Sequence, residues 1–418
     1  MRLYFFIFMK RLNKSTMNQL LGPYYVMPKP IGPLCNMDCT YCYYLNKKSI
    51  YKKCSDFEMS DEVLEIFTKQ YIETQPGNVL FTWHGGEPLL RGIDFYKKAL
   101  KLQKLYANGK HIENTIQTNG LLVTDEWCRF FKDNNILVGI SIDGPEHVHD
   151  KYRRQKNGKA TFSSVMETIE RFRRYEVQFN NLSVVNDYSS RFPLEIYQFF
   201  KEIGSHYMQF TPAVECKDKT SKPDRSQILA VHNCKESIVT PWSVKPLAYG
   251  TFLTALFDEW VSRDVGTYFV QFFDSVLANW CGVTPGVCVL AHTCGHAGVL
   301  EHNGDIYACD HFVFPEYRLG NIKEKRVSDL MFSERHKIFG ANKTASLSRT
   351  CKSCSYVNLC NGECPKNRFT QAASGESGNN YLCEGLKHFF KHTEESMRFM
   401  RNELFNKREA ANIMKNKF

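Results

Sequence analysis

The chain has 418 residues, of which 43% are hydrophobic and 23% are charged, a composition typical of a globular protein with two or three domains. No apolar run reaches the roughly 18 residues that a membrane-spanning helix needs. The formal net charge is +10, but its densest stretches, 151–159 and 171–174, are typical of solvated faces and lack the interleaved aromatics of a nucleic-acid site. We therefore expect neither a membrane nor a nucleic-acid partner.

Residues 1–20 are interpreted as an N-terminal extension that is either disordered or lies upstream of a true start at Met17. The apolar patch Leu3–Met9 is followed by Lys10 and Arg11, whereas a signal peptide carries its positive charges before the apolar run. The patch is also short and lacks a small-residue cleavage site. A signal peptide stays open as the less favoured alternative.

From about residue 24 to 211, short β-rich runs alternate with amphipathic helical patterns. Strands are predicted at Val79–Trp83, Asn114–Thr118, Ile136–Ile142, Val177–Val185 and Tyr207–Thr211. Helices are predicted at Asp61–Ile72, Phe95–Ala107, Asp125–Asn134, Thr161–Tyr175 and Pro193–Ile203. This alternation indicates βαβ units with a parallel sheet, in an α/β fold that forms a full or partial barrel. Functional sites in such folds lie at the carboxyl ends of the strands.

The rest of the chain changes character after this barrel domain, which we place at residues 21–247. Residues 216–248 are polar and weakly periodic, which indicates a loop or linker. Helical periodicity resumes at Ala248–Arg263 and again at Phe389–Lys407. We therefore predict three further regions: a linker helix region at 248–287, a cysteine-rich domain at 288–388 and a C-terminal helix at 389–418.

Sixteen cysteines are the main anomaly of the composition. A secreted disulfide scaffold would be short, and in a reducing cytoplasm clustered cysteines more often bind metal. We therefore expect a cytoplasmic metalloprotein. Five cysteines fit no pattern and are interpreted as ordinary thiols: Cys54, Cys128, Cys216, Cys234 and Cys281.

Three cysteines, Cys35, Cys39 and Cys42, lie within eight residues in the pattern C-x3-C-x2-C. Zinc sites usually close with four protein ligands. Three thiolates in one loop suit an iron–sulfur cubane with one iron left open, and an open iron is a reaction site. A structural zinc loop remains the alternative.

Polar motifs follow three of the predicted strands. Gly85-Gly86-Glu87-Pro88 comes after the first; glycines allow the backbone to approach a ligand closely, and Glu87 is a candidate acceptor for a ligand ammonium. Gln117 and Asn119 end the next strand, and Ser141 and Asp143 end the one after it. These side chains would meet at the barrel mouth, although turn capping is a simpler role for Asn119 and Asp143.

Eight more cysteines are concentrated near the C-terminus: Cys288, Cys294, Cys309, Cys351, Cys354, Cys360, Cys364 and Cys383. Eight thiolates are enough for two fully protein-bound 4Fe–4S clusters. They would equally satisfy two zinc sites, so the spacing alone leaves both metals open.

The first cysteine motif and the strand-end motifs, in this order, resemble the radical S-adenosylmethionine superfamily. The resemblance implies a partial (β/α)6 barrel and a 4Fe–4S cluster whose open iron binds S-adenosylmethionine. It also implies that Tyr41 packs near the adenine and that Ser141 contacts the ribose. The other cofactor contacts that it implies are Gly85, Gly86, Glu87, Gln117, Asn119 and Asp143.

The later cysteines closely resemble the SPASM extension of these enzymes, in which the ligands of two auxiliary 4Fe–4S clusters interleave. The resemblance assigns one cluster to Cys288, Cys294, Cys309 and Cys364. It assigns the other cluster to Cys351, Cys354, Cys360 and Cys383. With the first motif, the chain is expected to hold three clusters.

From Pro23 to Glu403 the chain is similar to the anaerobic sulfatase-maturating enzymes. The resembling segments are 30–35, 43–45, 125–131, 207–215, 309–310 and 362–369. The similarity implies that the chain oxidises a cysteine or serine in a C/S-x-P/A-x-R segment of an unfolded sulfatase to Cα-formylglycine. It also implies an electron donor such as flavodoxin or ferredoxin.

The resemblance also implies residue roles. A deoxyadenosyl radical would take a β-hydrogen, a base would take the thiol or hydroxyl proton, and an electron would leave through an auxiliary cluster. Asp310 matches the family's aspartate beside a cluster cysteine and is the expected base, with capping of the cluster loop as the alternative. Tyr44 matches an active-site tyrosine, although packing explains it equally well, and His84 stands where relatives have glutamine. Both are candidate substrate contacts.

Two other functions remain open from the sequence. A related SPASM enzyme would install a thioether or carbon–carbon link in a small precursor peptide. A non-catalytic zinc-binding interaction protein would need neither the first cysteine motif nor the Gly-Gly-Glu-Pro strand end.

Overall fold

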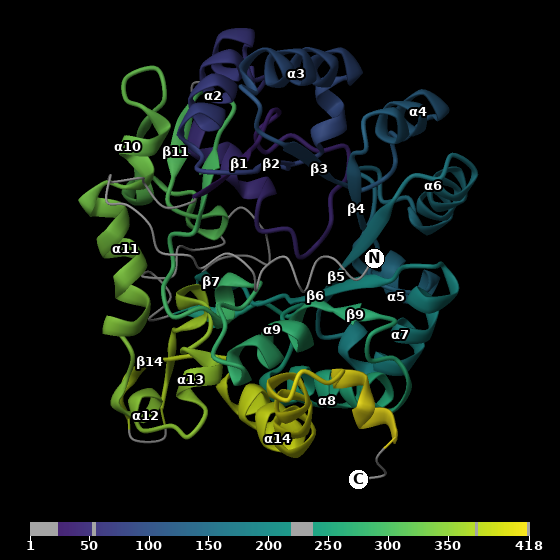
Figure 1. Ribbon diagram of the computed structural model, residues 1–418, viewed down its shortest axis with the longest axis vertical. Coiled ribbons are helices and arrows are strands. Elements are labelled where there is room, and N and C mark those ends of the chain that lie inside the picture. The colour runs from purple at the N-terminus through teal and green to yellow at the C-terminus, as the bar shows by residue number, and fades with distance from the viewer. Residues whose placement is uncertain (1–23, 52–55, 219–236, 373–374, 416–418) are drawn as a thin grey trace.

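The computed structural model describes residues 24–51, 56–218, 237–372 and 375–415. The predicted N-terminal extension and the thiols of Cys54 and Cys234 therefore lie outside the described residues. Helices cover the outer side of a curved sheet, and the elements α10 to α13 lie beside it, to the left in Figure 1.

The curved sheet has six parallel strands in the order β2-β3-β4-β5-β6-β9. Their bounds are Val79–Trp83, Ile112–Thr118, Leu137–Ser141, Phe179–Val185, Tyr207–Pro212 and Phe269–Val270. The first five lie where the alternation predicts them, and the partial α/β barrel is confirmed. The sequence missed β9 because this strand has only two residues and follows a long helix.

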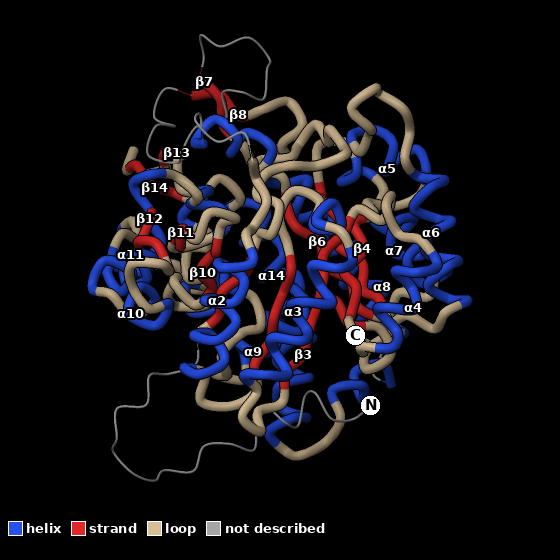
Figure 2. Tube along the Cα trace, turned by 90° about the horizontal axis from the view of Figure 1, so that it is seen from above, coloured by secondary structure: helices blue, strands red, loops and turns tan. Residues whose placement is uncertain are grey.

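Two of the connecting helices begin at a residue whose side chain caps the helix N-terminus. Ser60 caps the first of them by accepting a hydrogen bond from the backbone NH of Val63 (3.2 Å), and Thr124 caps α4 in the same way through Trp127. The helices are α2 (Asp61–Thr74), α3 (Ile93–Tyr106), α4 (Asp125–Asp133), α5 (Glu146–Tyr152), α6 (Phe162–Arg174) and α7 (Pro193–Glu202). Figure 2 shows α5, which follows β4, at the same end of the sheet as the hairpin that follows β6.

The first described strand, β1 (Tyr25–Pro28), does not extend the large sheet. It pairs in parallel with β10 (Ala297–Leu300) in a second sheet of order β1-β10-β11-β12. The other two strands are β11 (Asp305–Tyr307) and β12 (Arg318–Asn321). The backbone NH of His84 donates to the carbonyl of Pro28 (3.1 Å), so the ends of β1 and β2 meet. The N-terminal strand thereby joins the barrel to the cysteine-rich region.

The region 216–248 was predicted as a loop. It contains a short antiparallel hairpin of β7 (Cys216–Asp218) and β8 (Ser237–Val239), so the prediction is wrong for these two strands. The helices that follow are α8 (Pro246–Arg263) and α9 (Gln271–Trp280). The cysteine-rich region holds the helices α10 (Val327–Met331), α11 (Glu334–Ala345), α12 (Arg349–Lys352) and α13 (Val357–Cys360), with the strands β13 (Thr370–Gln371) and β14 (Ser377–Asn379). The last long helix is α14 (Cys383–Phe405), which begins before the predicted Phe389 and so carries Cys383 in its first turn.

Helix α14 crosses α8 at a pair of glycines. A Cβ atom on Gly385 would lie 1.9 Å from the carbonyl oxygen of Pro246, and one on Gly250 would lie 2.3 Å from that of Gly385. The two backbones can approach this closely only because neither residue has a side chain. This crossing fixes the helix that carries Cys383 against the barrel.

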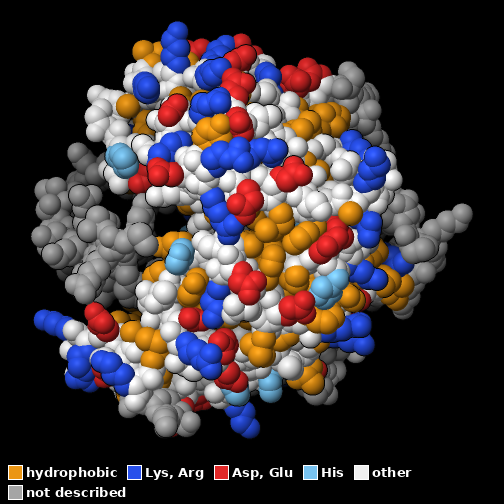
Figure 3. Space-filling model, turned by 90° about the vertical axis from the view of Figure 1, so that its right-hand side faces the viewer, with side chains coloured by type: hydrophobic (Ala, Val, Ile, Leu, Met, Phe, Trp, Pro, Cys, Tyr) orange, Lys and Arg blue, Asp and Glu red, His pale blue; other side chains and the backbone are white. Residues whose placement is uncertain are grey.

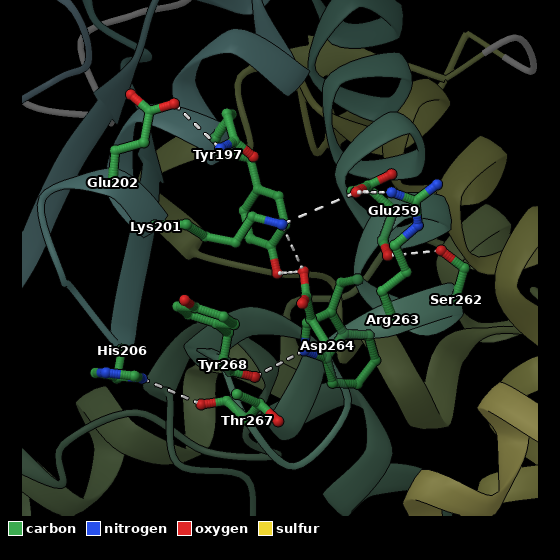
Figure 4. Close-up of polar contacts among 12 residues, drawn as sticks. Tyr197, Lys201, Glu202, His206, Glu259, Ser262, Arg263, Asp264, Thr267 and Tyr268 are labelled. Atoms are coloured by element: carbon green, nitrogen blue, oxygen red, sulfur yellow. Dashed lines mark hydrogen bonds and ion pairs between the residues drawn. The ribbon is translucent and has the colours of Figure 1, made fainter.

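A polar cluster holds the short strand β9 at the edge of the sheet (Figure 4). The hydroxyl of Tyr197 donates to Asp264 (2.8 Å), and the Lys201 ammonium lies 3.1 Å from the same carboxylate oxygen. The indole NH of Trp260 donates to the carbonyl of Tyr268 (2.8 Å), directly before β9. Residues of α7 and at the end of α8 thus fix the turn that leads into β9.

The surface seen in Figure 3 carries interspersed positive and negative side chains. The basic residues of α6 fit this description, since Arg171 lies 3.6 Å from Glu167 and Arg173 pairs with Glu170. Within the described part of the chain, every helix is too short or too polar to cross a bilayer.

Candidate active site and cluster sites

The loop of Cys35, Cys39 and Cys42 brings three thiols to the end of the barrel strands. The amide of Asn119, after β3, lies 3.7 Å from the sulfur of Cys35, and the backbone NH of Met37 donates to that sulfur (3.4 Å). Burial raises the pKa of Cys35 to about 12, and the charges of Cys39 and Cys42 add to the effect. Buried thiols that raise one another's pKa stay protonated unless a metal centre offsets their charge, so the residues of the loop fit an iron–sulfur cluster.

Gly85 and Gly86 pack their backbone on the segment that leads into Cys35. The backbone NH of Gly86 donates to the carbonyl of Gly32 (2.8 Å), and a Cβ on Gly86 would lie 1.8 Å from the carbonyl oxygen of Leu34. The close approach that the sequence assigned to a ligand is thus made by the cluster loop itself.

Glu87 is fully buried and ties the ends of β2 and β3 together. Its carboxylate accepts from the hydroxyl of Thr118 (2.8 Å) and from the backbone NH groups of Leu89 (3.0 Å) and Asn119 (2.8 Å). Burial raises the pKa of Glu87 to about 7. Protein donors therefore occupy most of the acceptor positions that the sequence assigned to a ligand ammonium.

A buried triad fixes the aromatic ring inside the cysteine motif. Tyr41 donates to Asp143 (2.6 Å) and accepts from the guanidinium of Arg153 (3.0 Å). Burial raises the pKa of Asp143, although the charge of Arg153 opposes the shift. The sequence placed Arg153 on a solvated face, which is wrong: its exposed fraction is 6%.

The other predicted strand-end residues also come together. The amide of Gln117 donates to the hydroxyl of Ser141 (2.9 Å), and the amide of Asn119 donates to the side chain of Asn36 (2.7 Å). Asn119 also caps its own turn by accepting from the backbone NH of Leu121 (3.0 Å). Residues after β3 and β4 therefore surround the cysteine loop, as the parallel sheet predicts.

Asp310 follows Cys309 in a short 3-10 helix (Asp310–Phe312) and lies where the two sheets meet. The ammonium of Lys29 is 2.6 Å from one carboxylate oxygen, and the hydroxyl of Tyr43 donates to the other. Burial alone would raise the pKa of Asp310, but the nearby cationic groups, Lys29 first among them, hold it below its ordinary range. The side chain as a whole keeps 20% exposure, while its carboxylate oxygens are held by Lys29 and Tyr43.

Lys29, which the sequence did not single out, is the centre of this network. Its side chain is fully buried, and its ammonium also lies 3.2 Å from Nδ1 of His84 and 4.2 Å from the centre of the Tyr44 ring. Nδ1 of His84 accepts from the backbone NH of Gly85 (2.8 Å) as well. Burial and the charge of Lys29 lower the pKa of His84 to about 3, so this imidazole is neutral at neutral pH.

Tyr44 and its neighbour Tyr43 point to different partners. The hydroxyl of Tyr44 donates to the buried Glu301, and its ring packs with Val299 and Val313. Tyr43 is the one whose hydroxyl reaches Asp310. The packing alternative left open for Tyr44 matches these contacts, and no feature of the sequence separates the two adjacent tyrosines.

The eight later cysteines fall into two groups in space. The first group consists of Cys288, Cys294, Cys309 and Cys364. Burial raises the pKa of Cys309, and the charges of Cys288 and Cys294 raise it further. Burial likewise raises the pKa of Cys364, and the charges of Cys309 and Cys288 add to this shift. The other group consists of four cysteines that line a single pocket: Cys351, Cys354, Cys360 and Cys383. Members of each group come from segments far apart in the sequence, as interleaved ligand sets require.

Two cations, the buried Lys343 and the half-buried Arg368, accompany these thiols. Lys343, with 1% exposure, donates to the backbone carbonyls of Cys288 (2.7 Å) and Val289 (2.8 Å). Arg368 donates to the carbonyl of Gly362 (2.9 Å). Burial lowers its pKa, and the charges of cysteines in both groups oppose this shift. Fixed cations beside four thiolates offset the negative charge of a cluster, so the residues present fit two iron–sulfur clusters.

We predict that Lys29→Met lowers the free energy of unfolding by about 3 kcal/mol, because it leaves the Asp310 carboxylate without its buried partner. A urea titration of the reconstituted protein measures this. The matched control is Lys47→Met: Lys47 is also buried and lies over the Phe314 ring (3.3 Å), but no carboxylate lies within 4.0 Å of it among the described residues. An equal loss in both variants would contradict a specific role for the ion pair.

Comparisons with known proteins agree with this geometry. Residues 30–196 match the radical SAM superfamily, and residues 294–355 match an iron–sulfur cluster-binding domain, SPASM. A serine-type anaerobic sulfatase-maturating enzyme of Bacteroides thetaiotaomicron is 53% identical over 97% of both chains. A cysteine-type enzyme of Clostridium novyi is 36% identical over 87% of this chain and 93% of its own length.

A solved structure of native anSMEcpe with bound AdoMet and Cp18Cys peptide is also similar, with a TM-score of 0.78 and 30% identity over 91% of this chain and 99% of that one. The two domain matches imply 4Fe–4S clusters and S-adenosylmethionine as cofactors. The extent of these similarities shows that the chain belongs to the anaerobic sulfatase-maturating enzymes, radical S-adenosylmethionine enzymes with an SPASM domain.

Proposed function

We propose that this chain oxidises the serine or cysteine of a C/S-x-P/A-x-R segment in an unfolded sulfatase to Cα-formylglycine. The observation that carries the proposal is the ionised Asp310, held by Lys29 and Tyr43 at the junction of the barrel and the cysteine-rich domain. Serine is the favoured target, because the serine-type relative is 53% identical and the cysteine-type relative is 36% identical.

The chain's own residues are assigned three tasks. When bound, the cluster of Cys35, Cys39 and Cys42 and its S-adenosylmethionine would supply the radical that takes a hydrogen from the target side chain. Tyr41, fixed by Asp143 and Arg153, would pack beside the adenine, and Gln117 and Ser141, which bind each other, would hold the ribose end of the cofactor. Asp310 accepts the proton of the substrate hydroxyl or thiol.

The remaining cysteines hold the auxiliary clusters in this proposal. One cluster is bound by Cys288, Cys294, Cys309 and Cys364, and the other by the four thiols that line one pocket. Because Asp310 is adjacent to Cys309, the proton acceptor would lie beside an electron acceptor when this cluster is bound. We also propose a cytoplasmic location and a flavodoxin or ferredoxin as electron donor, since free thiols in these numbers persist only where the compartment is reducing.

The proposal is tested by anaerobic incubation of the reconstituted protein with S-adenosylmethionine and two matched peptides, S-x-P-x-R and C-x-P-x-R. We expect mass spectrometry to detect an aldehyde that reacts with a hydrazide reagent, faster from the serine peptide. A peptide with alanine at the target position is the control. A product that resists the hydrazide and carries an internal crosslink would favour the peptide-crosslinking function instead.

A further inference from the structure

The segment after α5 forms a basic hairpin, residues 154–160, that covers the loop of the first cysteine motif. Its ends pair through an antiparallel bridge between Arg154 and Ala160, and the backbone NH of Gln155 donates to the carbonyl of Lys159 (3.0 Å). The hydroxyl of Thr161 fixes its base by donating to the carbonyl of the buried Arg153 (2.8 Å). The hairpin is therefore a built element with a defined position.

Backbone contacts attach this hairpin directly to the cysteine loop. The NH of Asp38 donates to the carbonyl of Arg154 (2.8 Å), and the NH of Thr40 donates to that of Tyr152 (2.9 Å). Both donors flank Cys39, which is itself only 8% exposed. The surface that directly overlies this thiol is therefore the basic hairpin and the residues that lead into it.

The charges on this surface lack partners of opposite sign. The side chains of Lys151, Arg154, Lys156 and Lys159 are exposed, and none has a carboxylate within 4.0 Å among the described residues. The other dense basic stretch behaves differently, because Arg171 and Arg173 pair with carboxylates of their own helix. An unpaired cluster of one sign costs some self-repulsion, which a partner of opposite charge relieves.

We propose that the basic hairpin is the docking site for a small acidic one-electron carrier protein that reduces the cluster at Cys35, Cys39 and Cys42. This inference rests on the proposed function, which requires that cluster to be reduced. One electron leaves the reduced carrier, the cluster gains it, and no bond forms or breaks. Redox encounters of this kind have small interfaces and depend on charge complementarity, which matches a compact patch of unpaired cations above a shielded redox centre.

The test uses the full chain with its clusters reconstituted and a variant that removes three charges, Arg154→Gln, Lys156→Gln and Lys159→Gln. The matched control removes three charges from α6, Arg171→Gln, Arg173→Gln and Arg174→Gln, and so has the same net charge. Reduced flavodoxin, kept reduced by its NADPH-dependent reductase, is the carrier probe. Dithionite, which needs no docking surface, is the second reductant.

Two readouts are expected to change in the hairpin variant alone. Its dissociation constant for flavodoxin at low salt, measured by titration calorimetry, should rise at least about 10-fold, and its flavodoxin-driven formation of deoxyadenosine should fall by a similar factor. The salt dependence of both should weaken, because fewer charges remain to be screened. The dithionite-driven rate should stay within about twofold of the parent enzyme and the control.

Three outcomes would overturn the inference. Equal affinity for flavodoxin in both variants would show that only net charge matters. An unchanged dissociation constant would remove the hairpin from the docking site. A dithionite-driven rate that falls only at low peptide concentration would show that the hairpin binds the sulfatase polypeptide instead. Failure of the parent enzyme with dithionite would reject the proposed function and not the docking site.

Discussion

Asp310→Asn is expected to leave cleavage of S-adenosylmethionine intact while slowing formylglycine formation at least about 100-fold. Asparagine keeps the shape of the side chain but cannot accept a proton. In the wild type, Lys29 at 2.6 Å keeps the carboxylate ionised at neutral pH. The same ion pair makes the Asp310 carboxylate a weak base, so its contribution to catalysis depends on its position. Cys309 precedes it in the chain and the Tyr43 hydroxyl binds it, and both restrict where the carboxylate can lie.

The measurement compares deoxyadenosine and peptide aldehyde from one reaction. The control is Asp305→Asn, which removes another buried carboxylate of the same domain, paired with Arg318 at 2.6 Å and without contact to Lys29. This control should keep the ratio of aldehyde to deoxyadenosine. A near-normal aldehyde yield from the Asp310→Asn variant would exclude Asp310 as the base. Loss of iron together with activity would instead support a capping role for the Asp310 carboxylate in the cluster loop.

The parts of the fold that follow from local pattern were predictable. Strand β2 was predicted with its observed bounds, Val79–Trp83, because a β-rich run lies between two helical patterns and is followed by a Gly-Gly turn. The cysteine motif and the strand-end residues were predicted to meet because parallel strands end at one edge of a sheet. The amide of Asn119 near the sulfur of Cys35 is the result.

The parts that depend on contacts between distant segments were not predictable. Lys29 pairs with a residue 281 positions later in the chain, and nothing around it in the sequence indicates that β1 joins the second sheet. Arg153 lies in a run of exposed basic residues, so its burial against Tyr41 has no local signal. The sequence singled out the glycines before Glu87 for a close approach to a ligand, but which backbone they approach is a property of the folded chain.

The sequence also could not predict which of the adjacent residues Tyr43 and Tyr44 contacts Asp310. Adjacent residues in a turn differ in direction by an amount that only tertiary packing fixes. Here the buried Glu301 binds the hydroxyl of Tyr44, which leaves the hydroxyl of Tyr43 for Asp310. The resemblance to a family identifies a position, whereas the hydrogen-bond partner of the side chain is determined by the folded chain.

Replacing Cys35, Cys39 and Cys42 together with alanine is expected to abolish cleavage of S-adenosylmethionine while leaving about eight iron atoms per chain of the roughly 12 expected in the wild type. The three thiols lie in one loop at the barrel mouth. The other eight lie in the cysteine-rich region and at the start of α14, where Lys343 and Arg368 bind neighbouring backbone carbonyls. Loss of the first cluster therefore removes no ligand from the other two.

Iron content and deoxyadenosine are measured on the same anaerobic preparation. The matched control replaces three thiols outside the groups, Cys128, Cys216 and Cys281, with alanine. It should retain about 12 iron atoms and full cleavage, because none of these residues lies in the cysteine loop or in either thiol group. Deoxyadenosine from the Cys35, Cys39 and Cys42 variant would place the radical site elsewhere. Stoichiometric zinc with little iron in the wild type would reject the cluster assignments altogether, because zinc closes its four thiolate ligands without an open coordination position and has no redox chemistry to offer.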